Sequence, residues 1–132
     1  METDFIRKVE EIIKVDPRYK VDAYEFVMRA LYYTQRKLKK KGHVVGKDLL
    51  EGMRRLCLEE FGPMARTVIE HWGIKTTEDV GNIVFNMINK GVMSKTEEDS
   101  IDDFKNIFDF KKAFDKTYKV QLERQLRKTK NL

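Results

Sequence analysis

The chain has 132 residues, of which 41% are hydrophobic and 37% charged, and its formal net charge is +5 at neutral pH. This length suits one domain that buries its own core, and a single cysteine, Cys57, excludes an internal disulfide. No apolar run approaches the length of a membrane span, and the charged first residues lack the apolar core of a secretion signal. We therefore expect a cytoplasmic protein with no membrane partner.

Helical periodicity dominates the sequence, with apolar residues recurring every three or four positions. Asp16 before Pro17 predicts a break, because the residue before a proline disfavours the helical region. Pro63 suits the first position of a helix, and Thr76 with Asp79 three residues later resembles a capping box. We expect helices over 3–14, 21–40, 48–60, 62–72, 76–91 and 110–128.

Three short stretches between these helices read as strands. Val44 and Val45 form one, and residues 92–94 and 106–108 form a possible hairpin around an acidic stretch. The expected fold class is therefore mainly α with a small β-sheet, in the element order of a winged helix. A single domain is predicted over 1–118, followed by a basic helix end or tail over 119–132.

Residues 70–91 have the pattern of a helix-turn-helix, in which the second helix either reads DNA or only packs. That helix begins with Glu78 and Asp79, and its exposed face is predicted to include Asn82 and Asn86. Residues 61–110 carry 5 Lys and Arg against 9 Asp and Glu, a balance of −4. Carboxylates at these positions repel phosphates, so the sequence favours packing over DNA reading.

Two basic clusters suggest a different nucleic-acid surface. One lies in the run RKLKKK at 36–41, and the other lies in residues 111–132, which carry 8 Lys and Arg against 2 Asp and Glu. If the clusters adjoin, they form a stripe for RNA or a ribosomal surface; the alternative is ordinary solvated charge. The residues predicted to contact RNA are Arg36, Lys37, Lys40, Lys41, Lys112, Lys116 and Lys119. Bases are predicted to stack on the rings of Tyr32 and Tyr33.

Catalytic and metal motifs are weak. His43 and His71 are the only histidines, and neither C-x-x-C nor H-E-x-x-H occurs. Cys57 lies in an apolar helical pattern, which raises a thiol pKa and disfavours a nucleophile. We therefore predict a non-enzymatic protein without a cofactor, metal or small-molecule ligand.

Protein association is the alternative function. The acidic centre and basic ends of the chain are complementary, which suits a homodimer or docking on another protein. Trp72, Phe104 and Phe108 are candidate interface anchors, although such aromatic residues also fill cores. The two hypotheses are thus a binder of RNA or ribosome surface and a protein-interaction or homodimeric scaffold module.

Six stretches together resemble a family of small, uncharacterised bacterial proteins: DPRY at 16–19, AYEFV at 23–27, HVVGKDLLEG at 43–52, FGPMA at 61–65, HWGIKTTEDVGNIVFN at 71–86 and KTEEDS at 95–100. The resemblance covers about residues 10–115, and the tail after Tyr118 lies outside it. Val45 and Lys47 depart from the small polar residue and the glutamine that it leads us to expect. It implies no reaction, cofactor or partner, so it supplies no site residues.

Overall fold

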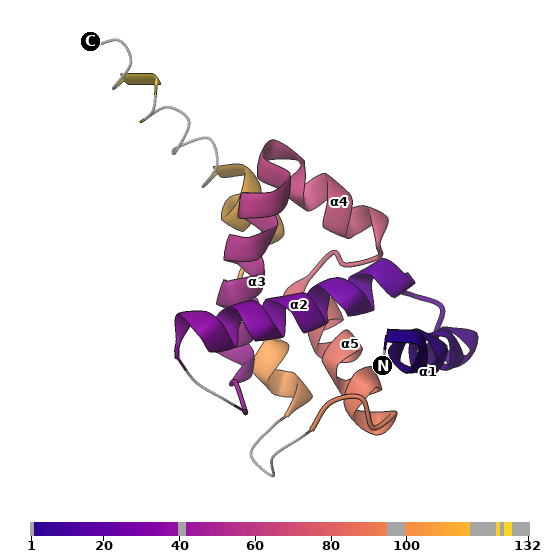
Figure 1. Cartoon of the computed structure of the whole chain (residues 1–132). Coiled ribbons are helices and arrows are strands. Elements are labelled where there is room, and N and C mark those ends of the chain that lie inside the picture. The colour runs from indigo at the N-terminus through magenta and orange to yellow at the C-terminus, as the bar shows by residue number, and fades with distance from the viewer. Residues whose placement is uncertain (1, 40–41, 95–99, 117–123, 125, 128–132) are drawn as a thin grey trace.

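The computed structural model describes residues 2–39, 42–94, 100–116, 124 and 126–127 (Figure 1). In this part of the chain, helices of three kinds follow one another. They are α1 (Glu2–Val15), α2 (Val21–Lys37), α3 (Gly46–Phe61), the 3₁₀ helix η1 (Gly62–Met64), α4 (Ala65–His71), α5 (Thr77–Asn89), the 3₁₀ helix η2 (Ile101–Phe104) and the π-helix η3 (Lys111–Lys116).

Helix α2 is the centre of the fold and packs against α3, α5 and α1 (Figure 1). Its core side carries an apolar stripe at helical spacing, with Ala23, Phe26, Val27 and Ala30 all at most 2% exposed. The approach to α3 is close because Gly52 faces Thr34: a Cβ on this glycine would lie 1.8 Å from the threonine Oγ1. Helix-on-helix burial of this kind supplies the main stabilising term of the domain.

The predicted β-sheet and winged-helix order are wrong, because none of the described residues forms a strand. Val44 is buried against the core and Val45 is the N-cap of α3, so the segment expected to be a strand leads directly into a helix. At 106–107 the backbone N–H groups donate to the side chains of Glu78 and Thr77, at 3.0 and 3.1 Å, instead of to a strand. The fold of the described chain is therefore entirely helical.

Part of the segment expected to be a wing, Ile101–Phe104, forms the 3₁₀ helix η2. Ser100 and Asp103 make a capping box there, which fixes a helical turn where the sequence pattern suggested a hairpin tip. Residues 95–99 of the predicted hairpin lie outside the described residues.

Several helix boundaries are confirmed. The chain leaves the helix at Asp16, and Thr76 and Asp79 form the expected capping box. Helix α2 ends earlier than predicted, at Lys37, and Lys39 has a φ of +52° that stops it from continuing. The predicted boundary at residue 118 and most of the tail lie outside the described residues.

Candidate functional site

The turn between α4 and α5 packs inside the domain. The Tyr19 hydroxyl donates to the Asp79 carboxylate at 2.5 Å, and the Asn106 backbone N–H donates to Glu78 at 3.0 Å. Thr77, the first residue of α5, is completely buried. The first turn of α5 is thus covered by two other segments of the same chain, and it does not present a free end to a DNA groove.

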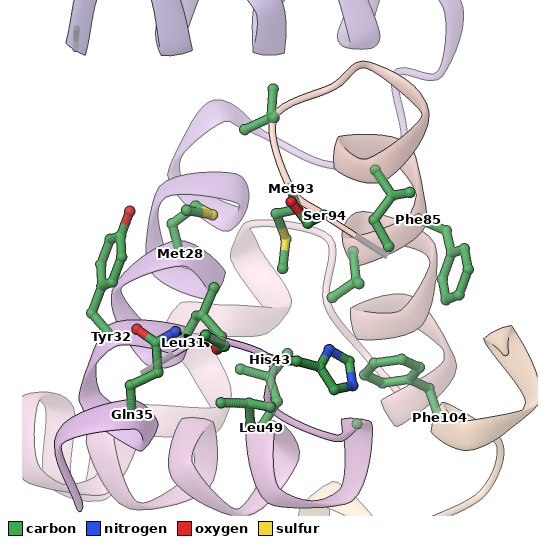
Figure 2. Close-up of a pocket in the computed structure, with 16 residues that line it drawn as sticks. Met28, Leu31, Tyr32, Gln35, His43, Leu49, Phe85, Met93, Ser94 and Phe104 are labelled. Carbon is green, nitrogen blue, oxygen red and sulfur yellow. Dashed lines mark hydrogen bonds between the residues drawn. The ribbon is translucent and has the colours of Figure 1, made fainter. Parts of the chain in front are cut away.

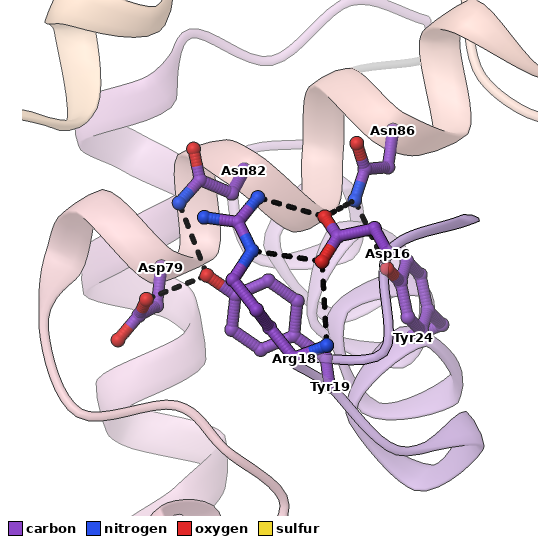
Figure 3. Close-up of polar contacts among 7 residues, drawn as sticks. All are labelled: Asp16, Arg18, Tyr19, Tyr24, Asp79, Asn82 and Asn86. Atoms are coloured by element: carbon purple, nitrogen blue, oxygen red, sulfur yellow. Dashed lines mark hydrogen bonds and ion pairs between the residues drawn. The ribbon is translucent and has the colours of Figure 1, made fainter. Parts of the chain in front are cut away.

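A polar network holds the loop between α1 and α2 against α5 (Figure 3). Arg18 donates to both carboxylate oxygens of Asp16, at 2.8 and 2.7 Å, and its guanidinium lies 5.2 Å from the centre of the Tyr19 ring. Asn86 donates to Asp16 at 2.9 Å and to the Tyr24 hydroxyl at 3.1 Å. The asparagine predicted to face solvent therefore has its amide in the network.

The pKa shifts in this network follow from its contacts. The hydrogen bonds from Arg18, with that from Asn86, hold the pKa of Asp16 well below its usual range. Burial, reinforced by the Asp79 carboxylate, raises the pKa of the Tyr19 hydroxyl. Among the described residues no buried polar side-chain atom lacks a hydrogen-bond partner. The network therefore serves as a structural clamp, and no buried polar group in it is left over for chemistry.

Protonating Asp16 is expected to weaken the fold. Because its pKa is lower in the folded than in the unfolded chain, its contribution is complete above the unfolded value of about 4 and is lost as the pH falls towards the folded value. We expect Asp16→Asn to lower the free energy of unfolding by about 1–2 kcal/mol at pH 7. Urea titrations from pH 7 to pH 2 should show this difference shrinking below pH 4; a constant difference would contradict the clamp.

An apolar groove opens between α2, the start of α3 and the second half of α5 (Figure 2). Its volume is about 290 Å³. In Figure 2 the α2 residues and Phe104 lie on opposite sides, with Met93 between the walls. None of the described Asp, Glu, Lys or Arg residues lines it. The lining is made of Met28, Leu31, Tyr32, Gln35, Gly42, His43, Val44, Gly46, Leu49, Val84, Phe85, Ile88, Val92, Met93, Ser94 and Phe104.

Glycines shape the floor of this groove. Phe104 is only 4% exposed, and its ring lies 3.0 Å from where a Cβ of Gly46 would be. The Cβ of Phe104 lies 2.8 Å from the corresponding position on Gly81. Gln35 donates to the Gly42 carbonyl at 2.6 Å, which ties the end of α2 to the chain that enters α3. Close packing of Phe104 thus fixes the floor of the groove, and the Gln35 hydrogen bond fixes one end.

Exposed apolar residues occur in the groove lining and next to it in the sequence. Tyr32 is 54% exposed, and Val45, between the groove residues Val44 and Gly46, is 46% exposed. Ile101, on the same 3₁₀ turn as Phe104, is also 46% exposed. Apolar side chains that stay in water around an apolar hollow are typical of a binding surface.

The predicted stacking tyrosines have different surroundings. Tyr33 is 7% exposed, its hydroxyl donates to Glu59 at 2.9 Å, and the Lys37 ammonium lies 5.5 Å from its ring centre. It therefore offers no face to a base, whereas Tyr32 does. A second, smaller cleft of about 200 Å³ lies beside Tyr32; it is lined by Arg29, Tyr32, Tyr33, Arg36 and Leu56.

The predicted basic residues are only partly described. Arg36 and Lys37 lie exposed at the end of α2, and Lys112 lies exposed on η3, which packs chiefly against α4 and α3. Within the described residues α2 and η3 do not pack closely against each other, so these two groups are not joined into a stripe there. Lys40, Lys41 and Lys119, and the side chain of Lys116, lie outside the described residues.

The predicted interface aromatics pack into the domain. Trp72 is half-buried, with its ring centre 5.5 Å from that of Phe26. Phe104 forms the groove floor, and the half-buried Phe108 lies 5.9 Å from Phe110. The groove residues themselves were missed, since Met28, Phe85 and Ile88 belong to helical stripes that also predict a core. One feature of the sequence could have indicated the groove: the apolar stripes of α2 and α5 are wider than a single packed helix face requires.

Nucleophilic and metal chemistry gain no support from the described residues. The Cys57 thiol is fully buried 3.6 Å from the Ala65 carbonyl, and burial raises its pKa to about 12. His71 lies 3.1 Å from the Lys20 ammonium. Within the described ranges, His, Cys, Asp and Glu side chains form no group of three that could hold a metal, and no helix is long and apolar enough to cross a bilayer.

Comparisons with known proteins assign neither a family nor a function to this chain. The chain matches no family model, no curated protein and no solved structure. The family resemblance in the sequence therefore remains a prediction that depends on the six quoted stretches.

Proposed function

We propose that this protein is a protein-interaction module that binds an apolar segment of another protein in the groove between α2 and α5. The observation that carries the proposal is the apolar lining of the groove together with Tyr32, a lining residue that stays 54% exposed. Desolvating such a surface is favourable by roughly 25 cal/mol per Å² of apolar area buried. Methionines in the lining, Met28 and Met93, suit a surface that adapts to a partner.

Two other ligand classes fit the groove less well. A small molecule is usually held in a hollow that buries most of its surface, whereas here the α2 residues of the lining, such as Met28 and Tyr32, are themselves partly exposed. RNA binding needs cations beside open aromatic faces. Tyr32 is open, but none of the described Lys or Arg residues lines the groove. Both classes are outcomes that the following experiment distinguishes.

Photo-crosslinking from the groove tests the proposal. Tyr32 is replaced by p-benzoylphenylalanine, and the matched control places the same group at Met64, which is equally exposed (53% against 54%) on η1. Because Tyr32 is a surface residue, the replacement should change the free energy of unfolding by less than about 0.5 kcal/mol. We expect a discrete protein adduct from position 32 in cells, absent from position 64.

The adduct must also depend on the groove. Adding Met93→Glu places a charge in the apolar lining and should abolish the adduct while the circular dichroism of the protein is unchanged. Equal adducts from both positions, an adduct that survives Met93→Glu, or crosslinks to RNA or a small molecule alone would each overturn the proposal.

A further inference from the structure

We infer that the segment bound in the groove is an amphipathic α-helix with an acidic flank that faces the C-terminal half of α2. This inference rests on the proposed function. The apolar stripe of the partner helix fills the groove, and its carboxylates pair with Arg36.

The groove suits a helix better than an extended peptide. Extended peptides gain affinity by adding to the edge of a sheet, and the described chain has no strand to offer. The α2 wall presents Met28, Leu31, Tyr32 and Gln35, which cover two helical turns or about 10 Å. A partner helix that lies along α2 places residues i, i+3 or i+4, and i+7 over the same length.

Positive charge lies directly beside the apolar wall. Arg36 is one turn after Tyr32 on α2, and both residues line the smaller cleft next to the groove. Arg29, one turn before Tyr32, is already paired with Glu60. Arg36 makes no ion pair within the described part of the chain, and the exposed Lys39 follows it. Among the described residues, Arg36 is therefore a cation on this helix that is available to a partner.

The opposite wall has the opposite sign. On the side of the groove opposite α2, Phe104 lines the floor (Figure 2). The neighbouring Asp102 and Asp103 of η2 are exposed. A partner with carboxylates on both flanks would be repelled there, so the complementary helix carries its acidic residues on the flank next to α2. Complementarity of this kind fixes orientation and suppresses wrong partners more than it adds affinity.

Binding of three synthetic helical peptides tests the inference. All carry the same leucine stripe and a fluorescein label, with glutamate, glutamine or lysine on one flank, and the readout is fluorescence anisotropy. With the full chain we expect the glutamate peptide to bind about tenfold more tightly than the lysine peptide. The difference should shrink at high salt, because the charges lie at the rim.

Charge reversal on the protein supplies the matched control. Arg36→Glu should invert the preference between the glutamate and lysine peptides, whereas Lys14→Glu, an equal change on the exposed end of α1, should leave it unchanged. Arg36 is exposed, and thermal unfolding should verify that the variant folds. Inversion by Arg36→Glu but not by Lys14→Glu would establish the contact.

The remaining outcomes separate this inference from the proposed function. Binding of all three peptides with equal affinity, lost in Met93→Glu, would leave the groove as an interaction site and overturn the acidic flank alone. Failure of every leucine peptide to bind would count against the proposed function as well. Binding of a labelled oligouridine instead, lost in Arg36→Glu, would assign this arginine to RNA and overturn the inference.

Discussion

Replacing Phe104 with alanine is expected to lower the free energy of unfolding by about 3–4 kcal/mol. The ring is 4% exposed and lies in a slot whose walls are glycines, because a Cβ on Gly46 would be 3.0 Å from its Cζ and one on Gly81 would be 2.8 Å from its Cβ. Neither glycine has a side chain that can move into the space that the ring leaves. The cavity therefore persists, and its cost adds to the lost burial.

Urea denaturation at neutral pH measures this effect. The control is Phe108→Ala, which removes an equal ring from a half-buried position and should cost clearly less. Equal losses for the two variants would mean that the slot between the glycines does not hold η2. The Phe104 variant should also lose binding of the leucine peptides, because the ring forms part of the groove floor.

Local signals predicted the helices α1 to α5 well, whereas the helix expected over 110–128 is described only as the π-helix η3 and at a few later residues. The break at Asp16 and the capping box of Thr76 depend on residues within four positions of each other, so one sequence is sufficient to find them. The strands failed for the same reason. Val44 and Val45 have the right residue types, but a strand also needs a partner, and the backbone groups near 106 bond to α5 side chains instead.

The candidate site was less accessible to sequence reasoning. Asn82 and Asn86 read as exposed positions of a recognition helix, yet their amides donate to Tyr19 and Asp16, which lie in a loop far away in the chain. The groove likewise joins Met28 on α2 to Phe85 on α5. Helical periodicity shows that such residues face the protein, but it does not show where two faces fail to meet and leave a hollow.

Gly52→Ala is expected to destabilise the protein by about 3 kcal/mol, although alanine is the better helix former by about 1 kcal/mol. The sign is decided by space at the crossing of α2 and α3. A Cβ at this position would lie 1.8 Å from the Thr34 Oγ1 and 3.0 Å from its Cβ, and Thr34 is 3% exposed. The hydroxyl also donates to the Ala30 carbonyl at 2.7 Å, which holds the side chain where it is. The helices must therefore separate to admit the methyl group.

A double-mutant cycle with Thr34→Ala isolates this clash. Removing the hydroxyl eliminates the 1.8 Å contact and leaves only the tight 3.0 Å one, so Gly52→Ala should cost about 1–2 kcal/mol less in the Thr34→Ala background. Urea denaturation of the four proteins gives the coupling energy. Additive effects would show that Gly52→Ala destabilises the protein for a reason other than the contact with Thr34. A Gly52→Ala protein more stable than the parent would show that α2 and α3 do not approach this closely. A coupling energy of the expected size would establish that α2 and α3 cross in close contact at Thr34. This crossing positions the α2 wall of the groove, since Leu31 and Gln35 lie close to Thr34 on the same helix.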